Sequence, residues 1–163
     1  MRKVISNTTP LIGLADIGCF DVLQKLYEEI MIPAAVFEEV KSEPARTLVR
    51  NSDFVYVYPV KDSQSRKMFS SRLHAGEVEV MLLAEERQAD LLIMDDNAAK
   101  KTAKFLGFKV TGTLGVLLKA KKEGHINDIG PLVEKLQETG FYVSPKVKQY
   151  FLEEANSMGG DMG

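Results

Sequence analysis

Two adjacent carboxylates at the end of a short apolar run are the residues of this chain best suited to chemistry. Asp95 and Asp96 directly follow the apolar residues 91–94. Such a run is typical of a strand buried on both faces of a parallel sheet, and ligands of these sheets bind where the strands end. Paired carboxylates at that edge suit a hard cation. The structural alternative is that Asp is a common helix N-cap and Asp-Asn a common turn.

Polar side chains from distant parts of the chain are expected at the same edge. In a parallel α/β sheet every helix begins near the carboxyl ends of the strands, so strand ends and first helical turns converge. The first expected strand ends in residues 7–9, the fourth in residues 95–97, and the helix expected after Gly76 carries an acid in its first turn. The side chains concerned are Asn7, Thr8, Thr9, Glu77, Asp95, Asp96 and Asn97.

Helical phase selects among the glutamates. At roughly 100° per residue, Glu77 lies within about 60° of the inward Val80, whereas Glu79 lies about 100° away on the other side. In the helix expected from residue 33, Glu39 flanks the apolar stripe and Glu38 points nearly opposite. We therefore favour Glu77 and Glu39 as site residues, with a surface glutamate pair as the alternative for the second helix.

The expected cluster of acids indicates a divalent metal. Carboxylates held together repel one another, which raises their pKa values unless a cation compensates. Their hard oxygen ligands select Mg²⁺ or Mn²⁺ rather than Zn²⁺. Two such ions about 4 Å apart can activate water and stabilise the leaving oxygen of a phosphodiester. The residues alone therefore favour a metal-dependent nuclease, whose candidate catalytic acids are Glu39, Glu77, Asp95 and Asp96.

The elements that must position these acids follow from length and periodicity. The chain has 163 residues, which fits one domain, here expected over residues 1–156 with a flexible tail over 157–163. Apolar runs alternate with helical patterns, which predicts an α/β fold with a parallel sheet. We expect strands over residues 3–6, 29–32, 54–60, 91–94 and 109–111. Helices are expected after residue 9 and over residues 20–27, 33–42, 61–72, 76–88, 97–106, 114–123, 129–138 and 145–155.

Composition excludes several protein classes. The single Cys19 excludes an intramolecular disulfide, and the only histidines, His74 and His125, are too few for a zinc cluster. No apolar run approaches the roughly 18 residues of a membrane span. The sequence thus predicts a cytoplasmic protein without a membrane segment, and we assign no catalytic role to Cys19, His74 or His125.

Charge permits an anionic partner without requiring one. The chain carries 21 basic and 23 acidic residues, a net charge of −2. Local basic groups are the exception, and each is either a solvated helix face or a phosphate contact. The candidate RNA-binding residues are Arg66, Lys67, Arg72, Lys100 and Lys101.

Four ordered segments resemble a PIN domain. They are residues 4–12 (VISNTTPLI), 32–40 (IPAAVFEEV), 75–79 (AGEVE) and 92–96 (LIMDD). The further run 112–121 (GTLGVLLKAK) is similar to a prokaryotic PIN-like subgroup allied to the VapC-type toxins of toxin–antitoxin pairs. The resemblance spans essentially the whole chain.

The resemblance implies a three-layer α/β/α sandwich around a parallel sheet of about five strands, with Mg²⁺- or Mn²⁺-dependent ribonuclease activity on single-stranded RNA. A small antitoxin protein would be a partner. The implied metal ligands are Asn7, Glu77, Asp95 and Asp96, with Glu39 as a further catalytic acid and Thr8, Thr9 and Asn97 in support. The chain departs from the family at Asn7, where the usual residue is Asp.

Two questions stay open at the level of sequence. Because Asn7 brings no charge, the alternative function is a catalytically degraded PIN domain that binds RNA or a protein without cleavage. A receiver domain is weaker, since it needs its acid pair after the first strand. The helix after Gly76 carries Val78, Met81 and Leu82 outside its inner stripe, which implies a second buried face. That face is covered either by the same chain or by a partner in a homodimer, and we expect the dimer.

Overall fold

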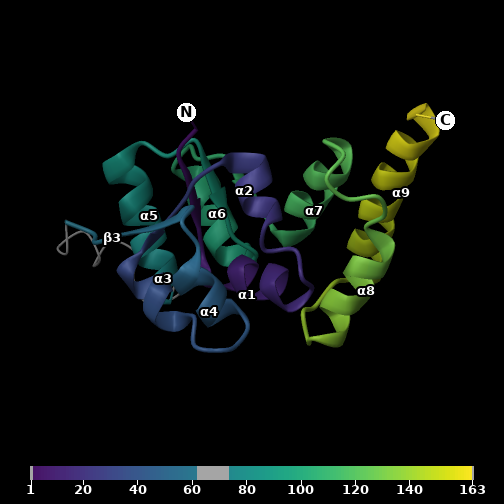
Figure 1. Ribbon diagram of the computed structural model, residues 1–163. Helices are drawn as coiled ribbons and strands as arrows, with labels where there is room; N and C mark the ends of the chain where they lie inside the picture. Colours follow the sequence, from purple (N-terminus) through teal and green to yellow (C-terminus); the bar gives the residue numbers. More distant parts are fainter. Residues whose placement is uncertain (1, 62–73, 163) are drawn as a thin grey trace.

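The computed structural model describes residues 2–61 and 74–162 (Figure 1). Its centre is a parallel sheet of five strands in the order β3-β2-β1-β4-β5. The chain first adds strands on one side of β1, through β2 to β3, and then on its other side, with β4 and β5. This change of side creates a switch point between β1 and β4, where ligands of doubly wound folds bind. The strands are β1 (Val4–Ser6), β2 (Ile30–Pro33), β3 (Val55–Tyr58), β4 (Leu91–Ile93) and β5 (Val110–Thr111).

The central strands are apolar because both of their faces are covered. Every residue of β1 and β4 is buried, as the uninterrupted apolar run before Asp95 predicts. β1 and β4 pair in register, with Ser6 opposite Ile93, and on its other side β1 pairs with β2 through Ile5 and Met31. All three central strands therefore end close to one another.

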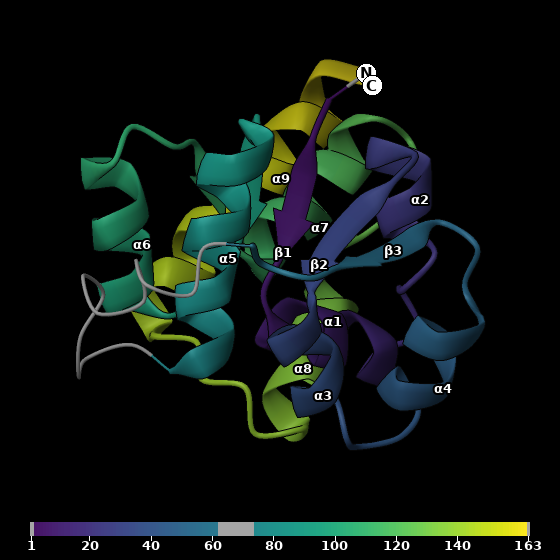
Figure 2. The same ribbon diagram turned by 90° about the vertical axis from the view of Figure 1, so that its left-hand side faces the viewer.

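Helices cover both faces of the sheet, so the fold is the expected three-layer sandwich. On one face α5 packs on β1 and β2, and on the other α1, α2 and α7 pack together (Figures 1 and 2). α9 packs on the outer side of α7. The helices are α1 (Thr8–Asp16), α2 (Val22–Tyr27), α3 (Ala34–Glu39), α4 (Ala45–Asn51), α5 (Ala75–Arg87), α6 (Asn97–Phe105), α7 (Thr113–Lys122), α8 (Gly130–Glu138) and α9 (Pro145–Met162).

The described elements differ from the expected ones in three places. Helix α4 was not expected. Its sequence, ARTLVRN, buries only Ala45 and Val49, which are too few to form a recognisable helical pattern. The helix expected from residue 33 ends at Glu39, and α9 continues to Met162, beyond the expected end at residue 155. The helix expected over residues 61–72 lies outside the described residues, apart from Lys61.

Within the described ranges, no helix combines the length and apolar character needed to cross a bilayer. Helix α5 is instead buried within the chain on most of its circumference, since Val78, Met81 and Leu82 are all buried. The second buried face of α5 is therefore covered by other parts of the same chain. It needs no partner subunit to cover it. The homodimer stays a prediction.

Candidate active site

Asn7 lies at the switch point of the sheet, directly after β1. Its backbone N–H donates to the carbonyl oxygen of Ile93 at 2.9 Å, so it continues the β1–β4 ladder and lies beside the acids that follow β4. Asn7 is the N-cap of α1, yet its side chain makes no capping bond to that helix. The residue is 5% exposed. Its amide is therefore held at the edge where the sequence placed it.

Glu39 joins the beginnings of two helices. Its Oε2 accepts a hydrogen bond from Thr8 Oγ1 at 2.8 Å, and its Oε1 accepts one from the backbone N–H of Gly76 at 2.9 Å. These bonds tie the last residue of α3 to the first turns of α1 and α5. Glycine at position 76 permits this close approach, because a Cβ on it would lie 2.9 Å from Glu39 Cδ and closer still to Oε2.

Glu77 is a buried acid in the first turn of α5, 4% exposed. Its side chain accepts a hydrogen bond from the backbone N–H of His74 at 3.0 Å, and the His74 side chain caps the Glu77 N–H in return. Burial raises the pKa of Glu77, and the negative charges of Asp96 and Glu39 raise this pKa further, against the bond from His74. Three acids from three separate segments therefore act on one another.

His74 has a partner that sequence reasoning did not identify. It is the N-cap of α5 and completes a capping box with Glu77. The pattern of a capping residue three positions before a glutamate was the available signal, but histidine is not a usual N-cap. His74 thus orients a candidate site acid while keeping a structural role.

The two adjacent aspartates serve different elements. Asp96 is the N-cap of α6 and accepts from the Ala99 N–H at 2.9 Å, while remaining exposed. Asp95 accepts two bonds from Thr113 at the start of α7, from N at 2.8 Å and from Oγ1 at 2.7 Å. Burial raises the pKa of Asp95, and the Thr113 bonds and the charge of Lys100 oppose that rise. The helix-cap and site interpretations of Asp96 are therefore compatible.

The types of ligand atom at this edge suit a metal ion, but the present spacing of the described side chains does not form a metal site. Asn7, Glu39, Glu77 and Asp96 offer only amide and carboxylate oxygens, which suit Mg²⁺ or Mn²⁺ in kind. Yet across residues 2–61 and 74–162 no three acidic, histidine or cysteine side chains are grouped closely enough to hold an ion. Glu39 and Asp96 are both exposed, but to turn toward a cation Glu39 would have to give up its bonds to Thr8 and Gly76, and Asp96 its bond to Ala99.

Glu79 is a buried acid that helical phase assigned away from the site. It is 6% exposed, and its Oε1 accepts a hydrogen bond from the Ala35 N–H at 3.1 Å. This bond satisfies the first turn of α3, because α3 packs closely against α5. Phase alone could not find this role, since it locates the inner face of α5 but not a neighbouring helix.

The other residues predicted for the site or for RNA binding lie in one cleft, elsewhere in the described part of the chain, or outside it. Thr9, Asn97 and Lys100 line a cleft of about 830 Å³ that also contains Asp95 and Asp96. Thr8 binds Glu39, as described above, and Lys101 is exposed on α6. The predicted RNA-binding residues that lie outside the described part of the chain are Arg66, Lys67 and Arg72.

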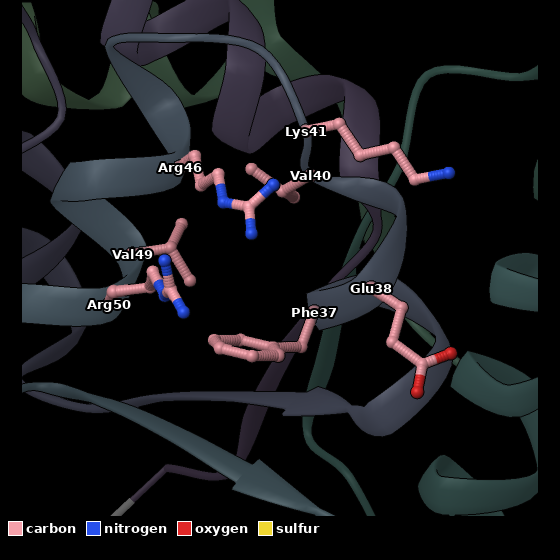
Figure 3. Close-up of a pocket in the computed structure, with 7 residues that line it drawn as sticks. All are labelled: Phe37, Glu38, Val40, Lys41, Arg46, Val49 and Arg50. Atoms are coloured by element: carbon pink, nitrogen blue, oxygen red, sulfur yellow. The ribbon is translucent and has the colours of Figure 1, made fainter.

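A second, smaller pocket of about 240 Å³ lies between α3 and α4 (Figure 3). Arg46 and Arg50 of α4 approach the ring of Phe37, and Glu38 points away from them (Figure 3). None of the candidate acids Glu39, Glu77, Asp95 and Asp96 lines it. The outward direction of Glu38 agrees with the helical phase that favoured Glu39.

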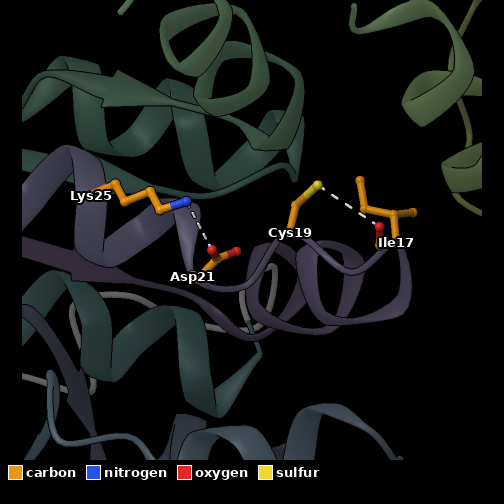
Figure 4. Close-up of polar contacts among 4 residues, drawn as sticks. All are labelled: Ile17, Cys19, Asp21 and Lys25. Carbon is orange, nitrogen blue, oxygen red and sulfur yellow. Dashed lines mark hydrogen bonds and ion pairs between the residues drawn. The ribbon is translucent and has the colours of Figure 1, made fainter. Parts of the chain in front are cut away.

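Cys19 has the structural role that its isolation predicts. It is buried and free, and its thiol donates to the carbonyl oxygen of Ile17 at 3.8 Å (Figure 4). Burial raises its pKa, and the charge of Asp21 adds to this rise. Asp21 is itself paired with Lys25 at 3.1 Å (Figure 4). A raised pKa disfavours the thiolate, so Cys19 is a packing residue.

The architecture agrees with the comparison to known families. A family model described as a PIN domain matches residues 3–157. No curated protein matches the chain. PIN domains are generally nucleases that use divalent metal ions and act on RNA. With a match over nearly its whole length, this chain belongs to the PIN domain family.

Proposed function

We propose that this PIN domain is a metal-dependent endoribonuclease that cuts single-stranded RNA. The observation that carries the proposal is the convergence of Glu39, Glu77 and Asp96, with Glu77 buried and its pKa raised in part by the other two charges. A fold that gathers like charges in this way is less stable than one that does not, unless a cation compensates. Such a cost is expected of a metal site, although each of the three acids also accepts a hydrogen bond from a nearby helix start.

Each acid has a distinct place in the proposed site. Glu77 and Asp96 hold Mg²⁺ or Mn²⁺, directly or through water, with the Asn7 amide as a neutral ligand. Glu39 faces the same space and is held by Thr8. The bound cation supplies charge neutralisation at the phosphodiester and activation of the attacking water. Thr9 and Asn97, at the first turns of α1 and α6, support the acids from the rim.

Asp95 has a positioning role in this proposal. Its two bonds to Thr113 fix the start of α7 beside the site. Because both of its oxygens accept from Thr113, Asp95 has less capacity than Asp96 for a direct bond to a cation. It is the structural member of the pair, and Asp96 is the ligand.

The biological setting is the toxin of a toxin–antitoxin pair in the cytoplasm, acting on RNA with a small antitoxin protein as partner. Support comes from the resemblance of residues 112–121 to the toxin-allied subgroup. In the structure this run forms the β5–α7 connection and most of α7, and its second residue, Thr113, binds Asp95. Co-purification of the chain with the product of a neighbouring small gene tests this part of the proposal.

The experiment that tests the nuclease itself is cleavage of unstructured RNA in Mg²⁺ or Mn²⁺. We expect cleavage to be abolished by EDTA and by Asp96→Asn. The matched control is Asp128→Asn, because Asp128 also accepts a backbone N–H at a helix start, from Gly130 at 3.0 Å, and lies outside the cleft. Activity that survives both EDTA and Asp96→Asn contradicts the proposal.

A second function is favoured by one observation. Asn7 stands where the family has an acid, and its buried amide adds no charge to attract a cation. A catalytically degraded PIN domain would bind RNA or a protein without cleavage. Filter binding distinguishes the two functions, because the degraded domain would retain RNA intact and would do so equally with and without metal.

A further inference from the structure

The cleft beside Asp96 has one wall that the nuclease chemistry does not use. That wall is the connection from α8 to α9 together with the first turns of α9. Phe141 and Phe151 pack against the core from this wall. Tyr142 lies between them in sequence and in the same cleft, yet it is 82% exposed. Its ring contributes little to the core and is open to a ligand.

Charge divides the cleft into two parts. Asp95, Asp96 and Lys100 supply its charged side chains, and its apolar and aromatic side chains include Tyr142 and Val147. Among the described residues that line the cleft, Lys100 is the single cation. The aromatic wall therefore suits a flat, uncharged group, and the charged part suits a phosphate once a divalent cation has neutralised the two carboxylates.

An RNA strand has these two chemistries in alternation. Its phosphates are anionic, and its unpaired bases are flat, uncharged and able to stack on aromatic rings. A strand with a phosphate at Asp96 would have a neighbouring base in the same cleft as Tyr142, because both residues line it. Lys100 lies next to Gly112 and Asp95, where it can contact a phosphate.

We propose that this cleft binds an unpaired nucleobase next to the cleaved phosphate, stacked on Tyr142. The inference rests on the proposed ribonuclease function and adds the reason for a preference for single strands, since a paired base cannot stack on a side chain. Tyr142 is then a specificity-determining residue from the C-terminal part of the chain, and Lys100 positions the adjacent phosphate.

Binding of single-stranded RNA in Ca²⁺, which can neutralise the carboxylates, tests the base site, with gel analysis to confirm that the RNA stays intact. The probe is an oligonucleotide that carries 2-aminopurine, whose fluorescence is quenched when it stacks. We expect Tyr142→Ala to weaken binding about tenfold and to abolish the quenching, since stacking on one side chain has about this effect. Tyr142→Phe should retain both. The matched control is Phe105→Ala, because Phe105 is 89% exposed and does not line the cleft.

The outcomes separate the base site from the nuclease. Equal affinity and quenching in wild type and Tyr142→Ala overturn the base site, and cleavage in Mg²⁺ that Asp96→Asn abolishes would leave the nuclease standing. Tyr142-dependent quenching of RNA that stays uncut in Mg²⁺ supports the base site and contradicts the nuclease. Failure of wild type to bind RNA at all overturns the base site in favour of a protein partner at this wall.

Discussion

Glu39 Oε1 lies 2.9 Å from the backbone nitrogen of Gly76, and this hydrogen bond joins the end of α3 to the start of α5. The contact is close because residue 76 has no side chain. Glu77 follows at once, so the same bond sets the distance between two candidate acids. The absence of a Cβ at position 76 is therefore part of the site.

Replacement of Gly76 by Ala should displace the Glu39 carboxylate. The new Cβ would lie 2.9 Å from Glu39 Cδ, and Glu39 is exposed enough to move away. Ala is also the better helix former, so we expect thermal stability to change little. A misplaced catalytic group can lower the rate roughly 10²-fold, which is the loss expected for RNA cleavage.

The control for Gly76→Ala is Gly130→Ala, the same change at the start of α8. A Cβ at Gly130 meets its nearest neighbour, Asp128 Oδ1, at an ordinary 3.4 Å. Initial rates and melting temperatures of both variants decide the matter. Full activity of Gly76→Ala would show that the position of the Glu39 carboxylate does not matter to catalysis.

Asn7→Asp should tighten binding of Mg²⁺ or Mn²⁺. The substitution restores a charge at the switch point, beside the segment that carries Asp96, and an added charge near a cation contributes more in a partly buried site than in water. We expect at least about a tenfold gain in affinity, which is about 1.4 kcal/mol. In the absence of metal the variant should be less stable, because its new charge repels Glu77.

Isothermal titration calorimetry measures the metal affinity of this variant. The control is Asn127→Asp, which adds the same charge at an exposed position outside the site. If Asn7→Asp and wild type bind metal equally, Asn7 is not part of the metal site. If Asn7→Asp alone cleaves RNA, the natural chain is the degraded form of the family.

The parts of the fold that were predictable are those that local pattern determines. The run before Asp95 is apolar without interruption because β4 is buried on both faces, whereas the pairing of β4 with β1 is known only from the structure. Helix α4 was not predictable from an apolar pattern, since its seven residues bury only Ala45 and Val49. It is stabilised by contact with α1 and by Glu43, whose carboxylate accepts from the Thr47 N–H at 2.9 Å.

Part of the candidate site was likewise predictable from local pattern, and part was not. Helical phase favoured Glu77 and Glu39, and the structure brings both to one edge with Asp96. The roles of Thr113 and Glu79 depend on contacts between segments far apart in the chain, 18 residues from Asp95 and 44 from Ala35. No periodicity within one helix carries that information. Hydrogen bonds between distant segments could therefore not be predicted from the sequence.

Glu77 should make the stability of the metal-free protein depend on pH. Burial and the charges of Asp96 and Glu39 raise its folded-state pKa above the ordinary 4.5. A raised pKa means that the proton favours the folded state. This contribution is complete below about pH 4.5 and is lost as pH rises through the folded-state value. Glu77→Gln removes it, so the variant should gain stability over wild type as pH rises toward neutral.

Melting temperatures of wild type and Glu77→Gln from pH 4 to 8 in EDTA measure this effect. The control is Glu85→Gln, because Glu85 is an exposed acid on the same helix. At a pH low enough to leave Glu77 partly protonated, metal binding should also release protons in wild type and fewer in Glu77→Gln, as titration in buffers of different ionisation enthalpy would show. A pH profile that is parallel for wild type and Glu77→Gln contradicts the raised pKa.

Asp95 and Asp96 should separate stability from activity although they are adjacent. Asp95→Ala removes both acceptors of Thr113 and leaves two donors at the start of α7 without partners, which should cost about 2 kcal/mol of unfolding free energy. Asp96→Asn keeps an N-cap of equal quality, so it should leave stability within about 0.5 kcal/mol and abolish RNA cleavage.

Chemical denaturation and RNA cleavage of the two variants test this division. Thr113→Val is the control for Asp95, because it removes the bond to Oδ2 while the bond from the backbone N–H to Oδ1 persists. It should therefore lose about half of the stability that Asp95→Ala loses. If Asp95→Ala is as stable as wild type but inactive, Asp95 is itself a ligand of the metal. If Asp96→Asn is unstable, its cap on α6 is the main role of Asp96, and the site must be built without it.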